Sequence, residues 1–325
     1  MEYSDPLLAS IAERLTNDDA GIRRVATMEL VDSPEPEAVS LLMRALADTD
    51  PNVRLEAAKV IDEFDAEDMT DALVEALTAS DENVRNAAAH ALADLKDPAA
   101  APALLAALSD SDGPADPKSV KDGFVIAGIL RALKPLKVEE TKSHALKYLG
   151  HEDSLVRREA VGVLGYLRDE QALPQLIHTA HHDGDSDVRR AAVGALVFAS
   201  HGKVEQALIS ALGDEHWQVR AEAANIIGRL EISSAVEGLV TSAADEYWQV
   251  REKSVEALGK LGAVESIEVL GRCAEDAISN LRKASIAALG EIGHSNGIPY
   301  VEKALADNDP DVRKLARWAM GKIAA

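Results

Sequence analysis

The sequence predicts an all-α fold, an α-solenoid of about ten two-helix repeats. The main signal is a recurring dipeptide, because Val, Leu or Ile precedes arginine at positions 23, 54, 85, 157, 189, 220, 251, 282 and 313. Neighbouring arginines are 31 or 32 residues apart except across one interval of 72, which is explained if Ile126 holds the arginine position of a degenerate tenth repeat. A period of roughly 20 to 50 residues is typical of solenoids, in which each repeat packs only on its neighbours.

Two helical patterns alternate within each repeat. In the second repeat, residues 36–46 have apolar residues every three or four positions, which predicts an amphipathic helix, helix A. Asp50 and Pro51 then begin helix B, predicted over residues 52–64, because aspartate is a good N-cap and proline suits the first helical position. An acidic residue recurs four positions before the arginine in several repeats, so we expect acidic capping to be general.

Helix B has a regular packing pattern. The positions one before the arginine and three, seven and ten after it are almost uniformly apolar and lie on one helix face. Alanine at three and six after the arginine allows neighbouring helices to approach closely, and glycine at eight relieves crowding or ends the helix. The arginines themselves are expected to form a ladder with acidic residues of their own or a neighbouring loop. The predicted helix pairs are 6–31, 35–64, 66–95, 98–136, 138–167, 171–199, 203–230, 233–261, 264–292 and 296–323.

The composition limits the classes of partner. The 325 residues include 34 basic and 56 acidic ones, a net charge of −22, which repels polyanions, so we expect no nucleic-acid partner. This acidic surplus also suggests a halophilic source with a salt-rich cytoplasm. Cys273 is the only cysteine, which excludes an internal disulfide and favours a reducing compartment. No stretch approaches about 18 uninterrupted apolar residues, so we expect a cytoplasmic protein without a membrane partner. We expect a single solenoid domain over residues 1–325.

Phrases of the form Val-Arg-x-x-Ala-Ala-x-Ala-Leu-Gly-x-Leu, repeated every 31 residues, resemble short HEAT repeats of the bilin-lyase type (E-Z/PBS-lyase-like). The resemblance covers essentially the whole chain. It implies a superhelical solenoid and two kinds of function. Some members of this group are chromophore lyase subunits that act on phycobiliproteins, and many others are scaffolds that bind proteins.

Departures from the repeat indicate where a function is located, because packing leaves those positions free. The fourth repeat carries an inserted Gly-, Pro- and Asp-rich loop at about residues 109–123, which is either a neutral insertion or a mobile docking loop. In the fifth and sixth repeats, glycines should form a hollow on the concave helix-B surface. Aromatic rings would form its wall, and guanidinium groups would hold a carboxylate or phosphate. The predicted partner-binding residues are Arg131, Arg158, Gly162, Tyr166, Arg190, Gly194 and Phe198, with Ala127 and Gly128 extending the surface. The alternative is that the aromatic rings only close gaps at the helix ends.

Trp217 and Trp248 occur one repeat apart at the first turn of helix B and form a predicted second pair. On the edge of the solenoid they would make a secondary interface, although tryptophan is also a packing residue in such repeats. Trp318 is expected to make a contact at the end of the stack.

Catalytic motifs are missing from the sequence. HEAT-like deoxyhypusine hydroxylases bind two irons through His-Glu dyads, whereas His151-Glu152 is the only such dipeptide here and lies in a predicted loop. No Walker loop, G-x-S-x-G elbow or Cys-His pair occurs. We therefore expect no catalytic residues, no metal and no cofactor. The sequence favours a non-catalytic scaffold or adaptor that binds a protein partner, and the alternative is a phycobilin-lyase-like subunit or chaperone that binds a chromophore or modified protein.

Overall fold

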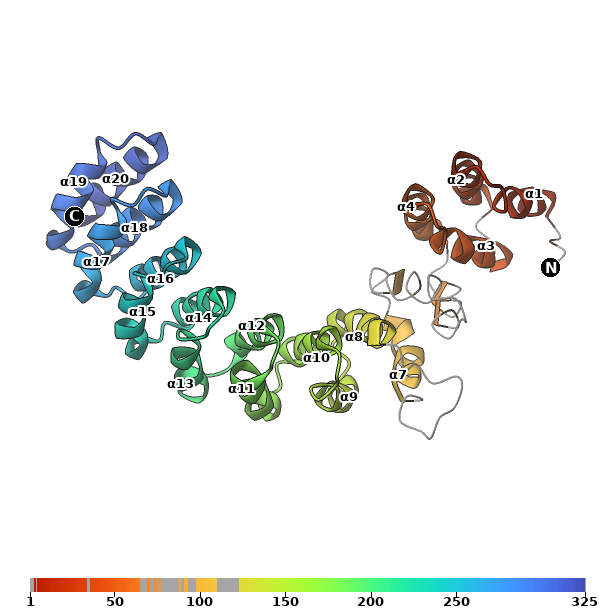
Figure 1. The fold of residues 1–325 in the computed structure, drawn as a ribbon, viewed down its shortest axis with the longest axis horizontal. Helices are drawn as coiled ribbons and strands as arrows, with labels where there is room; N and C mark the ends of the chain where they lie inside the picture. The colour runs from red at the N-terminus through yellow and green to blue at the C-terminus, as the bar shows by residue number, and fades with distance from the viewer. Residues whose placement is uncertain are drawn as a thin grey trace. The chain divides into compact units, whose positions relative to one another are not determined.

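The computed structural model describes residues 3, 5–33, 36–64, 69–70, 73–74, 76, 88, 91–92, 98–109 and 123–324. Every regular segment among them is helical (Figure 1). The chain divides into two compact units, unit 1 over Met1–Leu167 and unit 2 over Arg168–Ala325. Residues 110–122 of the inserted loop predicted at about 109–123, and most of the predicted pair at 66–95, lie outside the described residues.

Unit 1 contains helix pairs of the predicted kind. Short 3-10 turns follow two of its B helices, at Glu29–Asp32 and Ile61–Glu63, and another, at Pro98–Ala100, precedes an A helix. The A helices are α1 (Pro6–Arg14), α3 (Pro36–Leu46), α7 (Ala101–Ser109) and α9 (Thr141–Tyr148). The B helices are α2 (Ala20–Met28), α4 (Pro51–Val60), α8 (Gly123–Leu136) and α10 (Ser154–Leu167).

Unit 2 repeats the same pair. Four of its A helices begin with a 3-10 turn, at Glu170–Ala172, Ser233–Ala235, Val264–Ser266 and Ser295–Gly297, and a further turn, η6 (Leu196–Phe198), ends the first B helix. The A helices are α11 (Leu173–His182), α13 (His201–Ala211), α15 (Val236–Ser242), α17 (Ile267–Cys273) and α19 (Ile298–Ala304). The B helices are α12 (Ser186–Ala195), α14 (Trp217–Leu230), α16 (Trp248–Lys260), α18 (Ser279–Ile292) and α20 (Pro310–Ile323).

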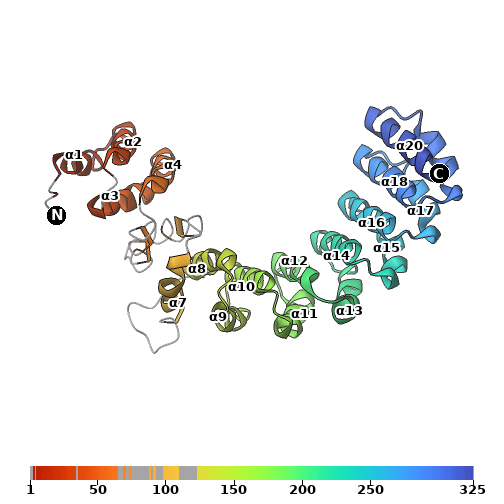
Figure 2. The ribbon, with the colours of Figure 1, turned by 180° about the vertical axis from the view of Figure 1, so that it is seen from behind.

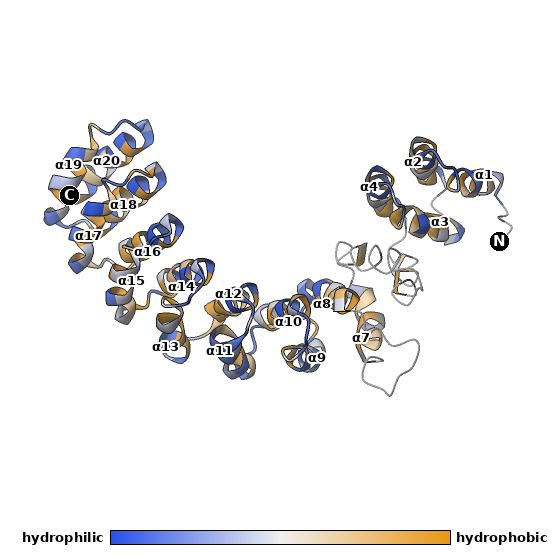
Figure 3. Cartoon of the chain, viewed as in Figure 1, coloured by the Kyte–Doolittle hydropathy of each residue, from blue (hydrophilic) through white to orange (hydrophobic). Residues whose placement is uncertain are grey.

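The helices of unit 2 form two layers. Both ribbon views show the B helices side by side in one layer and the A helices in the other (Figures 1 and 2). Successive B helices make many more contacts with one another than successive A helices do. The B layer is therefore the tighter one, and it forms the concave side of unit 2. Most helices carry both hydrophilic and hydrophobic residues, as the amphipathic pattern predicts (Figure 3).

Glycine permits the close approach of the B helices. A Cβ atom at Gly259 would lie 2.7 Å from both Cα and Cβ of Ala288, and one at Gly228 would lie 2.9 Å from the same atoms of Ala257. Each glycine stands eight positions after its arginine, and each alanine stands six after the arginine of the next repeat. The predicted relief of crowding is thus a direct glycine-to-alanine contact between repeats.

The arginines form a ladder between successive loops. The Arg220 guanidinium donates to the carbonyl oxygens of Asp214 and Glu215 in its own loop, at 2.9 and 3.1 Å. It also forms an ion pair of 2.7 Å with Asp245, which lies 25 residues further on in the next loop. The Asp245 carboxylate accepts a hydrogen bond from the backbone N–H of Tyr247 as well. The same spacing recurs in Arg23–Asp48, Arg189–Asp214, Arg251–Asp276 and Arg282–Asp307.

Acidic capping of the B helices is not general, in contrast to the prediction. Aspartates cap several of them, for example Asp50 on α4 and Asp185 on α12. Three consecutive helices, α14, α16 and α18, instead have His216, Tyr247 and Ile278 at the N-cap, and none of these side chains accepts a capping hydrogen bond. Since an N-cap typically contributes about 1 kcal/mol, these repeats lack a stabilising interaction that the others have.

Candidate protein-binding surfaces

Three cations of unit 1 surround one buried carboxylate. Glu159 lies on α10 with its side chain only 7% exposed. Its oxygens lie 3.2 Å from Arg131, 3.3 Å from Lys134 and 3.4 Å from Arg158. Burial alone would raise the pKa of Glu159, but the charges and hydrogen bonds of Lys134 and Arg131 outweigh it and lower the pKa. Glu159 is therefore ionised at neutral pH and holds the three cations in place.

Lys134 fills the place where a hollow was predicted. A Cβ atom at Gly162 would lie 3.1 Å from Cδ of Lys134, so the lysine stem covers this glycine. The Lys134 ammonium lies 5.8 Å from the ring centroid of Tyr166, which is 49% exposed. This part of the surface is a half-exposed basic patch beside an aromatic ring rather than a cavity.

Two residues expected to extend this surface do not lie on it. Ala127 and Gly128 are both buried on α8. This helix packs against α7 and α10, and its many apolar residues are covered on more than one side. The extension of the predicted site through these two residues is therefore wrong.

The predicted residues of unit 2 have a different environment. Arg190 forms an exposed ion pair of 3.1 Å with Asp187 on the same helix. Gly194 lies against Glu222 of α14, whose Oε1 would be 3.3 Å from an added Cβ atom. Phe198 is half-buried at the end of η6. That these residues join those of unit 1 in one site stays a prediction.

The aromatic pair on the edge of unit 2 differs from the predicted one. Trp217 stacks on Tyr247 rather than on Trp248, with ring centroids 5.6 Å apart and an angle of 15° between the ring planes. The guanidinium of Arg220 lies 5.8 Å from the Tyr247 ring, which is 40% exposed. Tyr247 was missed because it occupies the N-cap position, where a capping residue was expected. Trp248 is half-buried beside it.

Trp318 makes the expected contact on the last described helix. A Cβ atom at Gly290 of α18 would lie 2.5 Å from its ring, so Trp318 packs over this glycine. The Lys322 ammonium lies 6.0 Å from the Trp318 ring centroid.

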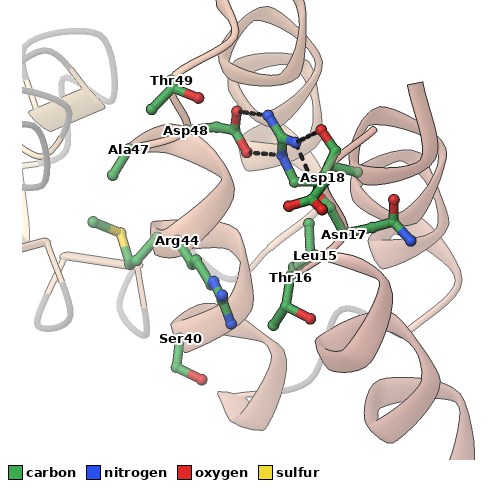
Figure 4. Close-up of a pocket in the computed structure, with 11 residues that line it drawn as sticks. Leu15, Thr16, Asn17, Asp18, Ser40, Arg44, Ala47, Asp48 and Thr49 are labelled. Carbon is green, nitrogen blue, oxygen red and sulfur yellow. Dashed lines mark hydrogen bonds and ion pairs between the residues drawn. The ribbon is translucent and has the colours of Figure 1, made fainter. Parts of the chain in front are cut away.

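Two open grooves occupy the same place in different repeats. In unit 1 a groove of about 700 Å³ lies beside the Arg23–Asp48 ion pair, and Arg44 extends toward Thr16 in it (Figure 4). In unit 2 a groove of about 510 Å³ lies beside Arg282 and Asp307. Lys303 takes the place of Arg44 there and forms an ion pair of 2.6 Å with Glu275. Neither groove was predicted.

Metal-binding clusters and membrane-spanning helices are absent from the described ranges. No group of three or more His, Cys, Asp and Glu side chains there is arranged to hold a metal ion. No helix in that part of the chain is long and apolar enough to cross a membrane. Cys273 is buried, and burial raises the pKa of its thiol.

The stacked helix pairs and their ladder define an α-solenoid. The chain belongs to the HEAT-repeat family, whose model matches residues 6–78, 45–116, 122–197 and 205–284. No curated protein is similar to it in sequence.

Solved structures share the fold. An engineered protein is 20% identical with a TM-score of 0.54, over 99% of this chain and 100% of its own. YibA of Escherichia coli is 15% identical with a TM-score of 0.55, over 100% of this chain and 98% of its own. Kap95p, which binds RanGDP, is 15% identical with a TM-score of 0.58, and 98% of this chain matches 49% of that protein. At these identities the similarity concerns the fold.

Proposed function

We propose that this protein is a non-catalytic scaffold, located in the cytoplasm, that binds a protein partner on the exposed face of its B helices. The observation that carries the proposal is the surface of α8 and α10. It combines an exposed aromatic ring, Tyr166, with half-exposed cations that Glu159 holds in place. Aromatic and arginine side chains supply much of the binding energy at protein interfaces, and residues fixed before binding lose little entropy.

The fold supports the same proposal. HEAT solenoids expose a continuous helical surface, and Kap95p, with the same fold, binds the protein RanGDP. The proposed partner-binding residues are Arg131, Arg158, Gly162 and Tyr166 in unit 1, and Arg190, Gly194 and Phe198 in unit 2. The edge formed by Trp217, Tyr247 and Trp248 is its secondary interface.

Affinity capture from native lysate, at the salt concentration of the source, tests this proposal. The wild type is compared with Tyr166→Ala and Phe198→Ala, and captured proteins are identified by mass spectrometry. Leu305→Ala is the matched control, because it removes an exposed apolar side chain away from the B helices. A protein captured by the wild type and the control, and lost in Tyr166→Ala, supports the proposal. Equal capture by all variants removes Tyr166 and Phe198 from the interface.

The resemblance to bilin lyases provides a second candidate, a subunit that binds a chromophore or a modified protein. Its test is optical, because a bound linear tetrapyrrole changes its visible absorption. Addition of a linear tetrapyrrole to the purified protein leaves the spectrum unchanged if the protein is only a scaffold. A spectral change that is lost in Tyr166→Ala supports the chromophore-binding function.

A further inference from the structure

The exposed surface of the B helices has an uneven charge. Apart from the ladder arginines, which are bound to loops, the exposed charges of α12, α14, α16 and α18 cancel within each helix. In the pair α8 and α10, Arg131, Lys134 and Arg158 face the single acid Glu159, an excess of two positive charges (three minus one). The helix α20 has an equal excess, but its cations do not surround a buried acid. This excess stands out in a chain with a net charge of −22.

The cations of this patch keep hydrogen-bond donors that Glu159 does not use. An arginine side chain has five N–H donors in a planar arrangement suited to carboxylates. Arg131 uses Nε and one Nη2 contact, and Arg158 uses one contact through Nη2. The side chains of Arg131 and Arg158 are 32% and 38% exposed, so the remaining donors are accessible from solvent.

We infer that the basic patch of Arg131, Lys134 and Arg158, with Tyr166 at its border, binds an acidic segment of the partner protein. This inference rests on the proposed scaffold function. Carboxylates of the segment accept hydrogen bonds from the free N–H groups of the two arginines, and its carbon chain packs on the Tyr166 ring. The ion pairs with Glu159 fix the cations beforehand, so binding requires little ordering of these side chains.

The size of the patch favours a short acidic segment over a nucleic acid. Charge interactions are screened beyond about 10 Å at 0.1 M salt, so a short segment experiences mainly the local positive field. A nucleic acid extends past the patch and requires many phosphate contacts, and it meets the repulsion of the surplus acidic residues elsewhere. The positive charge of the patch therefore favours a short acidic segment, and the net negative charge of the chain opposes a nucleic acid.

Fluorescence anisotropy with a labelled peptide of Asp, Glu, Gly and Ser tests the inference. We expect binding that weakens as NaCl rises, and a loss of about tenfold in affinity for Arg158→Ala. This variant leaves Arg131 and Lys134 on Glu159, so the buried carboxylate stays paired. The exposed Tyr166 allows a second variant, because Tyr166→Glu should repel the peptide, whereas Tyr166→Lys should retain it.

The last described helix, α20, offers a matched control. Lys314→Ala with Arg317→Ala removes positive charge from an exposed B-helix surface where the cations do not surround a buried acid. We expect it to leave peptide affinity unchanged. An equal loss in this control, or no peptide binding at low salt, overturns the inference. Tighter binding of a labelled single-stranded DNA through Arg158 also overturns it.

The two proposals fail separately. If a protein is captured through Tyr166 but the acidic peptide does not bind, the scaffold function stands and the acidic segment is wrong. If the peptide binds through Arg158 and no protein is captured, the patch is an anion site and the scaffold function is wrong.

Discussion

Substitution of Gly259 by alanine should destabilise unit 2 because of its contact with the next repeat. The new Cβ atom would lie 2.7 Å from Cα and Cβ of Ala288 and 2.8 Å from Oε2 of Glu291. The glutamate can move, but the backbone of α18 has to shift. Overpacking of this kind costs about 1 to 3 kcal/mol. Alanine also gains about 1 kcal/mol in helix propensity over glycine, which offsets part of this cost.

Gly321→Ala is the matched control for this substitution. Gly321 has the same repeat position and also lies in the last turn of its helix, but in the described part of the chain no neighbouring helix or side chain lies within 4 Å of its Cβ position. The propensity gain is common to both variants, so the difference between them of about 1 to 3 kcal/mol measures the packing cost.

Urea denaturation followed by circular dichroism measures this difference. Hydrogen exchange with mass spectrometry then locates it, because repeats of a solenoid can open separately. We expect faster exchange in α16 and α18 for Gly259→Ala than for the wild type, and no such increase for Gly321→Ala. Equal stability of the two variants would refute the argument that glycine is needed for this helix approach.

Three further predictions concern the backbone, pH and salt. Glu231 has a left-handed backbone (φ 54°), and Gly262 occupies the equivalent position one repeat later. Glu231→Gly should therefore raise the free energy of unfolding by about 1 kcal/mol. A lower free energy of unfolding in urea denaturation contradicts this prediction. Burial alone would raise the pKa of Asp214, but the hydrogen bonds that its carboxylate accepts from Arg189 and His216 lower it. The stabilisation of the folded state by the ionised Asp214 is therefore complete above the unfolded pKa of about 3.9 and is lost as pH falls through the folded pKa. Asp214→Asn should therefore lower stability at pH 7 by about 1 to 3 kcal/mol, with a smaller difference from wild type below pH 4 in denaturation curves. Finally, the net charge of −22 predicts that the denaturation midpoint rises between about 0.15 and 1 M KCl, and a flat or falling midpoint argues against a halophilic source.

The sequence was sufficient for the architecture because the repeat pattern is local. Spacing of apolar residues located the helix pairs, and the position of glycine in helix B indicated the close contact that Gly259 makes with Ala288. The ion pairs of the ladder were also expected, because an arginine recurs at the same position of most repeats. These features depend on a residue and its equivalent one repeat later, which the sequence displays directly.

The surfaces were harder to predict because they depend on which side chains meet across helices. Glu159 is one acid among many in the sequence, and only the packing of α10 on α8 brings Arg131 and Lys134 to it. Lys134 was not among the predicted residues, although it covers Gly162. Likewise, Tyr247 stacks on Trp217 because two successive loops lie side by side, a contact that the spacing of the tryptophans did not indicate.

The arginine ladder makes each loop of unit 2 dependent on the helix before it. Arg220 binds its own loop through two carbonyl oxygens and the next loop through Asp245, whose carboxylate in turn orders the turn that begins α16. A pulling force applied along the unit is therefore resisted by these ion pairs together with the packing of successive B helices. Under tension we expect the repeats to unfold one after another. Each repeat that unfolds removes the arginine that pairs with the aspartate of the next loop, and this aspartate orders the following turn.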